Sequence, residues 1–354
     1  MNAAAKNYDG VNKYIRITDI DEASSTYKDK DIVSPDGVLA DNYLVNNRDI
    51  LLARTGASTG KSYLYKKSDG KLYYAGFLIR ANVTTHDPYF VFSQLHTHRY
   101  WRWVSIMSAR SGQPGINSQE YSSFPIYTTS IEEESKIAKL LSLLDERIAT
   151  QNKIIDKLQS LIKGIVDCTI LRKEKNAIVG DVCSISEQIR AEANIDDIIT
   201  VRLHGNGVCK SSAENLQLGA TQYYRRRAGQ LIYGKQNFHN GAIGIVPISL
   251  DNGITSKDIP SFDIDEMKCN SVYLLAQLQS PQYYKPAEAL TTGTGSKRLK
   301  EETFLKMPIV LPNKREQDNI AVLIHRASMN LDHAKRLLEL LSIQKQFLLR
   351  QMFI

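Results

Sequence analysis

The chain has 354 residues and a formal net charge of +7, and 42% of its residues are hydrophobic. That length is enough for two or three domains with their own cores, and the basic charge favours proteins that bind nucleic acid. No apolar run approaches the ~18 residues of a membrane span, and the N-terminus lacks the apolar segment of a signal peptide, so a cytoplasmic protein is expected.

Residues 1–127 have the pattern of a small domain that mixes strands and helices. The stretch from Asp49 to Arg54 predicts a buried strand, and residues 63–65 and 72–74 predict a β-hairpin across the polar segment between them. An aromatic-rich stretch from Tyr89 to Met107 predicts one helix. A loop rich in Gly, Ser and Gln follows, and it leads into a short strand that ends the domain.

A glycine-rich loop, Thr-Gly-Ala-Ser-Thr-Gly-Lys-Ser at residues 55–62, follows the buried strand. It resembles the phosphate-binding loop Gly-x-x-x-x-Gly-Lys-Ser/Thr of nucleotide hydrolases, in which Lys61 would contact phosphate. Only three residues separate Gly56 from Gly60, so Thr55 takes the first glycine position, where a β-branched side chain disfavours the required backbone conformation. An ordinary turn explains the loop better. Three of its polar side chains are candidates for DNA contacts: Arg54, Ser58 and Lys61.

Residues 131–171 form a long helical pattern. Apolar residues recur at alternating steps of three and four, which is the a/d seam of a coiled coil, with Gln151 at its polar position. The seam consists of Ile137, Leu141, Leu144, Ile148, Ile155, Leu158 and Ile162. Because such a face cannot remain in water, we expect a second helix to cover it.

The C-terminal segment supplies that second helix, because it repeats the first at a numbering offset of 183. Phe124-Pro125-Ile126 maps onto Met307-Pro308-Ile309, and no gap is needed across the helix. Gln151 is matched by Ala334, and Ile162 is matched by Lys345. The second seam consists of Ile320, Ile324, Leu331, Leu338 and Leu341. We therefore expect the two helices to pack together.

Residues 176–312 repeat the first domain. Residues 230–233 match residues 49–52 at an offset of 181, which becomes 183 at the Pro–Ile strand, so the chain contains an internal duplication. The predicted segments are domains 1–127 and 176–312 and helices 128–175 and 313–354. The opening of the second domain, residues 178–199, has no counterpart in the first, which we expect to be short at its N-terminus.

Polar loops lie at matched places in the two halves. Residues 110–117 and 291–298 each follow a helix and precede the Pro–Ile strand. Gln, Asn, Arg and Lys are the side chains that pair with base edges in the major groove, although an ordinary surface turn is the alternative for each loop. The candidates are Arg110, Gln113 and Asn117 in the first half and Lys235, Asn237, Asn240, Lys297 and Arg298 in the second.

No catalytic or metal-ligating set can be argued from spacing. His96 and His98 are two residues apart in the expected helix, where they would not share a face, and the four cysteines form no Cys-x-x-Cys pair. We therefore expect no catalytic residue and no metal site in this chain.

The order and duplication of these motifs resemble the specificity subunits of Type I restriction–modification systems. The stretches that carry the resemblance are residues 49–56, 111–117, 229–233, 241–247 and 292–298 and the two Pro–Ile strands before the long helices. The resemblance implies an α/β (α+β) protein with two target-recognition domains, separated by two long helices that pack as an antiparallel coiled coil. Each domain would read one half of a bipartite DNA site, and the helices would fix the spacing.

The resemblance also implies partners. The helices would dock two methyltransferase (modification) subunits, and restriction (motor) subunits would join in the full complex. S-adenosylmethionine, ATP and Mg would then belong to those partners, with no cofactor in this chain. Two other classes stay open: a nucleotide-binding enzyme that uses residues 55–62, and a coiled-coil scaffold with no DNA role.

Overall fold

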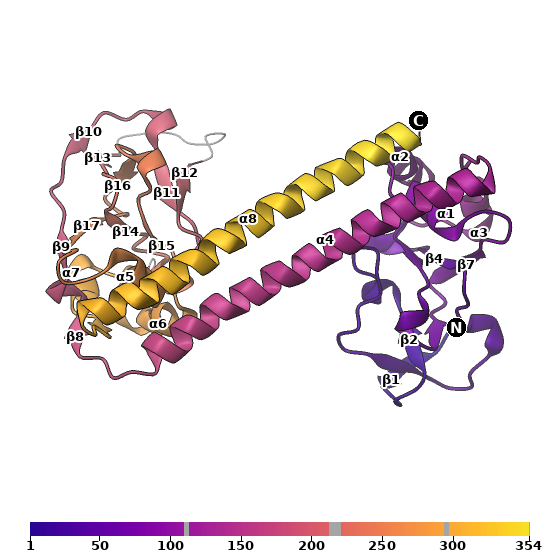
Figure 1. The fold of residues 1–354 in the computed structure, drawn as a ribbon, viewed down its shortest axis with the longest axis horizontal. Helices are drawn as coiled ribbons and strands as arrows, with labels where there is room; N and C mark the ends of the chain where they lie inside the picture. Colours follow the sequence, from indigo (N-terminus) through magenta and orange to yellow (C-terminus); the bar gives the residue numbers. More distant parts are fainter. Residues whose placement is uncertain (110–112, 212–220, 294–296, 354) are drawn as a thin grey trace. The chain divides into compact units, whose positions relative to one another are not determined.

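The computed structural model describes residues 1–109, 113–211, 221–293 and 297–353, which form two compact units. Unit 1 comprises Met1–Ile154 and Ala334–Ile354, and unit 2 comprises Ile155–His333. The long helices α4 (Ile131–Val166) and α8 (Lys314–Met352) each contribute to both units (Figure 1). Within the described residues, no helix combines the length and the apolar character that a membrane span requires.

The strands of unit 1 form small sheets. They are β1 (Ala4–Asn7), β2 (Lys13–Ile15), β3 (Val33–Asp36), β4 (Asp49–Ala53), β5 (Ser62–Leu64), β6 (Leu72–Tyr74) and β7 (Leu78–Asn82). β4 is central, with antiparallel β5 and β7 on its two edges, while β1 pairs with β3 and β2 with β6. All of β4 is buried, because Ile50 and Leu52 pack into one core and Leu51 and Ala53 into another, as the two-residue period of a strand requires.

The hairpin expected between residues 63–65 and 72–74 is wrong. β5 pairs with β4, and β6 runs parallel to β2. Tyr63 and Leu72 still bury their side chains in the same core, together with Ile15. The apolar pattern therefore predicted the burial correctly, but it does not determine which strands pair.

The single helix expected from Tyr89 to Met107 is also wrong, because the structure divides it into α1 (Pro88–Gln94) and α2 (His98–Met107). Thr97 causes the division. Its hydroxyl donates to the carbonyl of Gln94 at 2.7 Å and accepts from the backbone N–H of Tyr100 as the N-cap of α2. A third short helix, α3 (Ser118–Ser122), precedes α4.

Unit 2 is built around a four-stranded sheet in the order β15-β14-β17-β9. Its strands are β8 (Ala177–Ile178), β9 (Cys183–Ile185), β10 (Arg190–Ala191), β11 (Ile199–Val201), β12 (Val208–Lys210), β13 (Tyr223–Arg225), β14 (Leu231–Tyr233), β15 (Ile243–Ile245), β16 (Ile254–Ser256), β17 (Ser261–Ile264) and β18 (Pro308–Ile309). The short helices are α5 (Ser271–Leu278), α6 (Pro281–Tyr284) and α7 (Glu301–Leu305). One large core joins the sheet to these helices and to parts of α4 and α8.

The strand registers reproduce the duplication. Leu51 lies opposite Tyr63 in unit 1, and Ile232 lies opposite Gly244 in unit 2, so the offset of 181 holds for both members of the pair. The offset is already 183 at α1 and α5, whose N-caps are Asp87 and Asn270. The two additional residues therefore lie between β17 and α5, which is ahead of the Pro–Ile segment, where the offset is also 183.

Matching polar side chains support the same conclusion. Buried Gln94 accepts from the N–H of Tyr127 and donates to its carbonyl, both at 2.8 Å. Buried Gln277 makes the same two bonds with Val310, at 2.8 and 3.5 Å. Each glutamine therefore holds the segment that leads into a long helix, and the offset of 183 holds for the glutamine and for its partner.

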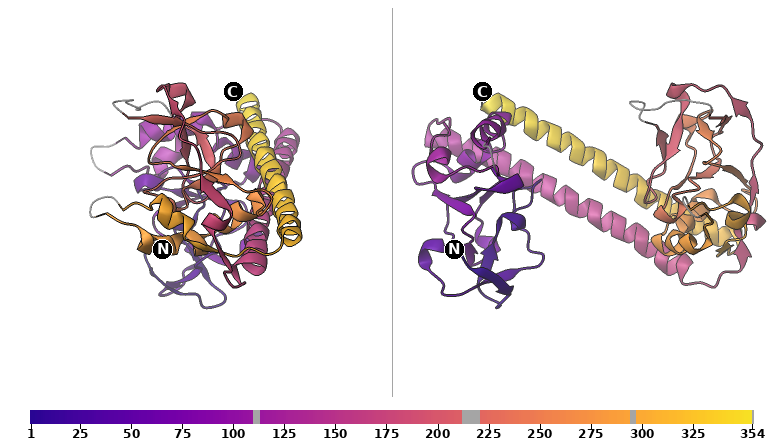
Figure 2. Two further views of the ribbon diagram at one scale, coloured as in Figure 1. Left: turned by 90° about the vertical axis from the view of Figure 1, so that its left-hand side faces the viewer. Right: turned by 180° about the vertical axis from the view of Figure 1, so that it is seen from behind.

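In unit 1, α4 and α8 lie side by side and run in opposite directions (Figure 2). Gln151 donates to the carbonyl of its expected counterpart Ala334 at 3.0 Å, and Asp145 forms an ion pair with Lys345 at 2.6 Å. In both units together, the buried seam residues are Leu141, Leu144, Ile155, Ile320, Ile324 and Leu341, and the half-buried ones are Ile137, Ile148, Leu158, Ile162, Leu331 and Leu338. The chain is thus a mixed α/β protein of two small-sheet domains with its long helices in contact.

Candidate nucleic-acid interface

The loop that follows β4 pairs with the loop that precedes α3. Thr55 forms a β-bridge with Gly115, and the N–H of Gly56 donates to the carbonyl of Pro114 at 2.9 Å. The N–H of Ile116 donates to the carbonyl of Arg54, also at 2.9 Å. Two segments that are far apart in the sequence are therefore joined by their backbones. We call this pairing the unit 1 node (residues 54–60 and 113–117).

Two buried tyrosines hold the unit 1 node against the sheet. Tyr121 donates to the carbonyl of Ala53 at 2.6 Å and accepts from the N–H of Gly60 at 3.0 Å, and Tyr100 donates to the carbonyl of Gly60 at 2.8 Å. Burial raises the pKa of Tyr121 to about 12, so its phenol stays protonated at neutral pH. Gly60 has a φ of +92°, which favours glycine at this position.

The predicted side chains of unit 1 have different surroundings. Arg54 and Gln113 are exposed and Ser58 is half-buried, whereas Arg110 lies outside the described residues. The Oδ1 atom of Asn117 is occupied, because it caps α3 by accepting from the N–H of Glu120 at 2.9 Å. The structure therefore brings Arg54, Ser58, Gln113 and Asn117 to one node.

The glycine-rich loop does not have the surroundings of a phosphate-binding loop. It leads directly into strand β5, whereas the phosphate-binding motif places the residues after its Lys at the N-terminus of a helix. Lys61 itself forms an ion pair with Glu22 at 3.1 Å. Both observations count against a nucleotide hydrolase that uses Lys61.

Unit 2 contains an equivalent pairing, which we call the unit 2 node (residues 235–241 and 297–300). The N–H of Leu299 donates to the carbonyl of Lys235 at 2.9 Å, as Ile116 does to Arg54. A concavity of about 470 Å³ opens beside it and contains three cationic side chains. Its lining residues are Lys235, Thr292, Gly293, Arg298 and Lys300.

The two candidate asparagines lie in the turn after β14. Asn240 donates to the side-chain oxygen of Asn237 at 3.3 Å, so each side chain constrains the other. Gly241 ends this turn with a φ of +76°, and a Cβ atom there would lie 2.9 Å from the ring of Tyr284. The turn is therefore packed closely on α6, and Asn237 remains exposed.

Two comparisons with known proteins bear on this arrangement. The family described as the Type I restriction modification DNA specificity domain matches residues 1–160. The Type I restriction enzyme MjaVIII specificity subunit of Methanocaldococcus jannaschii is 21% identical over 308 residues, which cover 78% of this chain and 72% of that protein. The family model thus identifies residues 1–160 as a Type I specificity domain, and the chain as a whole is similar to the specificity subunits of Type I restriction–modification systems. These are the non-catalytic, DNA-binding members of the systems.

Solved structures share the fold of this specificity subunit. The S subunit of the Type I restriction–modification system from M. genitalium superposes with a TM-score of 0.66 at 13% identity, covering 98% of this chain and 89% of that one. A chain from a study of complex assembly and conformational transition in the type I system has a TM-score of 0.50 at 13% identity, with coverage of 96% and 90%.

Carboxylates accompany most of the candidate cations of the specificity subunit. Besides Lys61 with Glu22, the pairs are Lys235 with Glu301 at 2.7 Å, Lys297 with Glu288 at 3.1 Å and Arg298 with Asp258 at 3.3 Å. The pair of Lys297 and Glu288 is more than half exposed on both sides and contributes only about 0–1 kcal/mol, so a DNA phosphate can replace that carboxylate at low cost. None of the four carboxylate partners could be predicted from the sequence, because sequence spacing does not show which charges meet in space.

Proposed function

We propose that this specificity subunit reads a bipartite DNA sequence, with the unit 1 node on one half-site and the unit 2 node on the other. The main support for this proposal is that the same backbone arrangement occurs at both nodes, where it carries different side chains. Arg54 and Gln113 are exposed at the first node, and Lys235 and Arg298 line the second. Arg and Lys favour guanine, whereas Gln favours adenine. A shared frame with different donors is suited to reading two different half-sites.

The two recognition domains would comprise residues 1–127 and 176–312, and residues 128–175 and 313–354 would form the spacer. The seam side chains would then keep the helix pair rigid, so that the helix length sets the gap between the half-sites.

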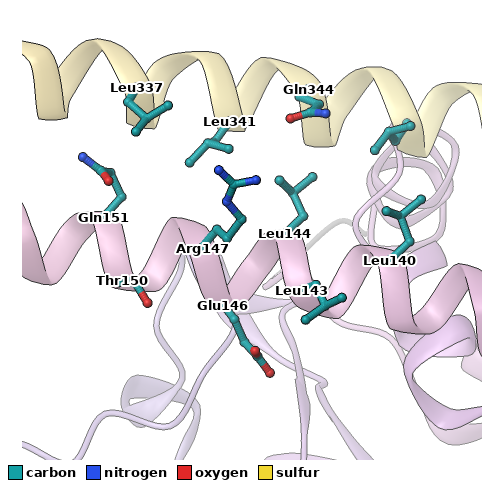
Figure 3. Close-up of a pocket in the computed structure, with 11 residues that line it drawn as sticks. Leu140, Leu143, Leu144, Glu146, Arg147, Thr150, Gln151, Leu337, Leu341 and Gln344 are labelled. Atoms are coloured by element: carbon teal, nitrogen blue, oxygen red, sulfur yellow. The ribbon is translucent and has the colours of Figure 1, made fainter.

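Both long helices also carry exposed apolar side chains outside the seam. In unit 1 the exposed ones include Leu140, Leu143, Leu337, Leu340, Ile343 and Phe347, and in unit 2 they include Leu161, Val322, Leu323 and Met329. A groove of about 590 Å³ lies between α4 and α8 in unit 1, where Leu140, Leu143 and Leu337 line it beside Arg147 (Figure 3). Contiguous apolar surface of this kind marks protein–protein interfaces.

One pair of these exposed apolar positions follows the duplication. Leu140 and Leu323 are related by the same offset of 183, and both are exposed, one in each unit. Matched surfaces of this kind suit two copies of one partner, which we assign as two methyltransferase subunits. Restriction subunits would join this assembly in the cytoplasm, and S-adenosylmethionine, ATP and Mg would act in those partners.

The test is to purify the specificity subunit with its methyltransferase subunits and map the methylated adenines across random DNA. The expected result is a motif of two half-sites with a fixed gap. Methylation of one half-site alone would show that one recognition domain does not read DNA. Association without sequence preference would favour the coiled-coil scaffold, and nucleotide binding that disappears in Lys61→Ala would favour the hydrolase.

A further inference from the structure

Phe77 and Asp258 occupy equivalent positions in the two units. Phe77 lies in the turn before β7, and Asp258, at the offset of 181, lies in the turn before β17. The carbonyl of Phe77 accepts from the N–H of Arg54 at 3.1 Å, and the carbonyl of Asp258 accepts from the N–H of Lys235 at 2.9 Å. Each turn is therefore joined by its backbone to a residue just beyond the central strand, which is the first residue after β4 and the second residue after β14.

Three segments thus meet at each node. Arg54 donates to the turn at Phe77 and accepts from Ile116, and Lys235 donates to the turn at Asp258 and accepts from Leu299. These bonds involve only backbone atoms, so they fix the position of the turn whatever side chain it carries. A position of this kind can change its side chain between two half-sites without changing the frame, which is what recognition of different bases requires.

The side chains at the two positions differ in chemistry. Phe77 is 62% exposed, and among the described residues it belongs to none of the hydrophobic cores. A single exposed Phe is common on protein surfaces, but this one is held beside Arg54. The carboxylate of Asp258 instead accepts from Nη2 of Arg298 at 3.3 Å, and both side chains are about half exposed beside the concavity.

We propose that Phe77 and Asp258 are specificity-determining residues, each acting on one base pair of its own half-site. Phe77 makes an apolar contact with a thymine methyl group, which is the apolar feature of the major groove. Asp258 is a positioning residue that orients the guanidinium of Arg298 for bidentate hydrogen bonding to the O6 and N7 atoms of guanine. This inference rests on the proposed function and assigns side chains and bases within it.

The test uses the same methylation map, made with the full chain and its methyltransferase subunits. Phe77→Ala is expected to weaken the thymine preference at one position of the first half-site about fourfold, the equivalent of one buried methyl group. Asp258→Asn is expected to weaken the guanine preference at one position of the second half-site by about 5- to 150-fold. The other half-site should be unchanged in each variant.

Matched controls separate recognition from a general loss of structure. Val38→Ala removes another exposed apolar side chain of unit 1, and Asp265→Asn breaks a comparable exposed pair with Lys268 in unit 2. Neither should alter the motif. Phe77→Leu, which remains apolar, should keep the thymine preference. Asp258→Asn should add nothing to the loss caused by Arg298→Ala, because the carboxylate acts through that side chain.

The outcomes distinguish the two proposals. A bipartite wild-type motif that Phe77→Ala and Asp258→Asn leave unchanged would overturn this inference and leave the proposed function standing. Equal weakening at every position would mean that the two residues support only the fold or general affinity, and would also overturn it. A wild-type chain without a bipartite motif would overturn the proposed function, and this inference with it.

Discussion

Leu141 and Leu140 are neighbours in α4 with opposite surroundings, so one substitution made at both sites tests the assignment of the seam. Leu141 is 1% exposed and packs with Phe90, Leu349 and Phe353, whereas Leu140 is 46% exposed. Truncation to alanine removes three carbon atoms, worth about 2.4 kcal/mol at about 0.8 kcal/mol each when they are fully buried. With the cavity left behind, we expect Leu141→Ala to cost about 3–4 kcal/mol.

Leu140→Ala is the matched control. Because nearly half of this side chain is already exposed and no closed cavity forms, we expect a loss of about 1 kcal/mol. Urea unfolding followed by tryptophan fluorescence gives the measurement, since both tryptophans of the chain, Trp101 and Trp103, lie in unit 1. The loss should therefore appear in the unfolding of that unit.

Binding of the methyltransferase subunit should be weakened more by the substitution at Leu140 than by the one at Leu141, which is the opposite of the order expected for stability. If the exposed face docks a methyltransferase subunit, Leu140→Ala weakens the association while leaving the fold intact. Equal losses of stability for Leu140→Ala and Leu141→Ala would refute the assignment of the seam. A chain that keeps full affinity for its partner after Leu140→Ala together with Leu337→Ala would refute the docking surface.

Three further predictions concern a turn, pH and spacing. Gly60→Ala should destabilise unit 1 by more than about 2 kcal/mol in urea unfolding, because φ is +92° and the new Cβ atom would lie 2.7 Å from a methyl group of Val104. Burial lowers the pKa of the His96 imidazole from 6.5 to about 4. Between pH 4 and pH 6.5 this imidazole is therefore protonated in the unfolded chain and neutral in the folded one. The stability of unit 1 should therefore be fully present above pH 6.5 and fall by roughly 2–3 kcal/mol toward pH 4, and His96→Gln should remove most of that dependence. Deleting residues 148–154 together with 331–337 shortens both helices by about 10 Å, so the gap in the methylated motif should shrink by about three base pairs.

The long helices could be predicted from the sequence because their signal is local and repeated. Alternating steps of three and four residues fix which face of α4 is buried, and the offset of 183 identifies α8 as its counterpart. The pairing of Gln151 with Ala334 follows from the same offset, and the structure confirms it. Periodicity is sufficient here because each successive turn of the helix places apolar residues on the same face.

Strand pairing and helix breaks could not be predicted in this way. The apolar patterns of β5 and β6 identify buried strands but contain no information about their partners, which lie elsewhere in the sequence. The break between α1 and α2 depends on a single hydroxyl, that of Thr97, which the aromatic pattern around it conceals. Propensity therefore identified the segments and failed at their connections.

The candidate site shows the same division. The glycine-rich loop and the Gly/Gln loop are visible in the sequence by composition, and the structure joins them at the unit 1 node. Phe77 and Asp258 could not be found from the sequence, because their backbone carbonyl oxygens hold them at the nodes. Every residue type has such a carbonyl, so the residue type gives no signal. Only the offset of 181 between the two turns could have pointed to them.

The division of the chain into units has a consequence for the order of folding during synthesis. Unit 2 is one continuous stretch, Ile155–His333, whereas unit 1 needs Ala334–Ile354 to cover Leu141 and Ala138. A nascent chain therefore holds a finished second unit while the first still exposes part of its apolar surface. We infer that the turns of α8 from Ala334 onward complete the earlier domain last, and that unit 1 is prone to non-specific association until those turns have been synthesised.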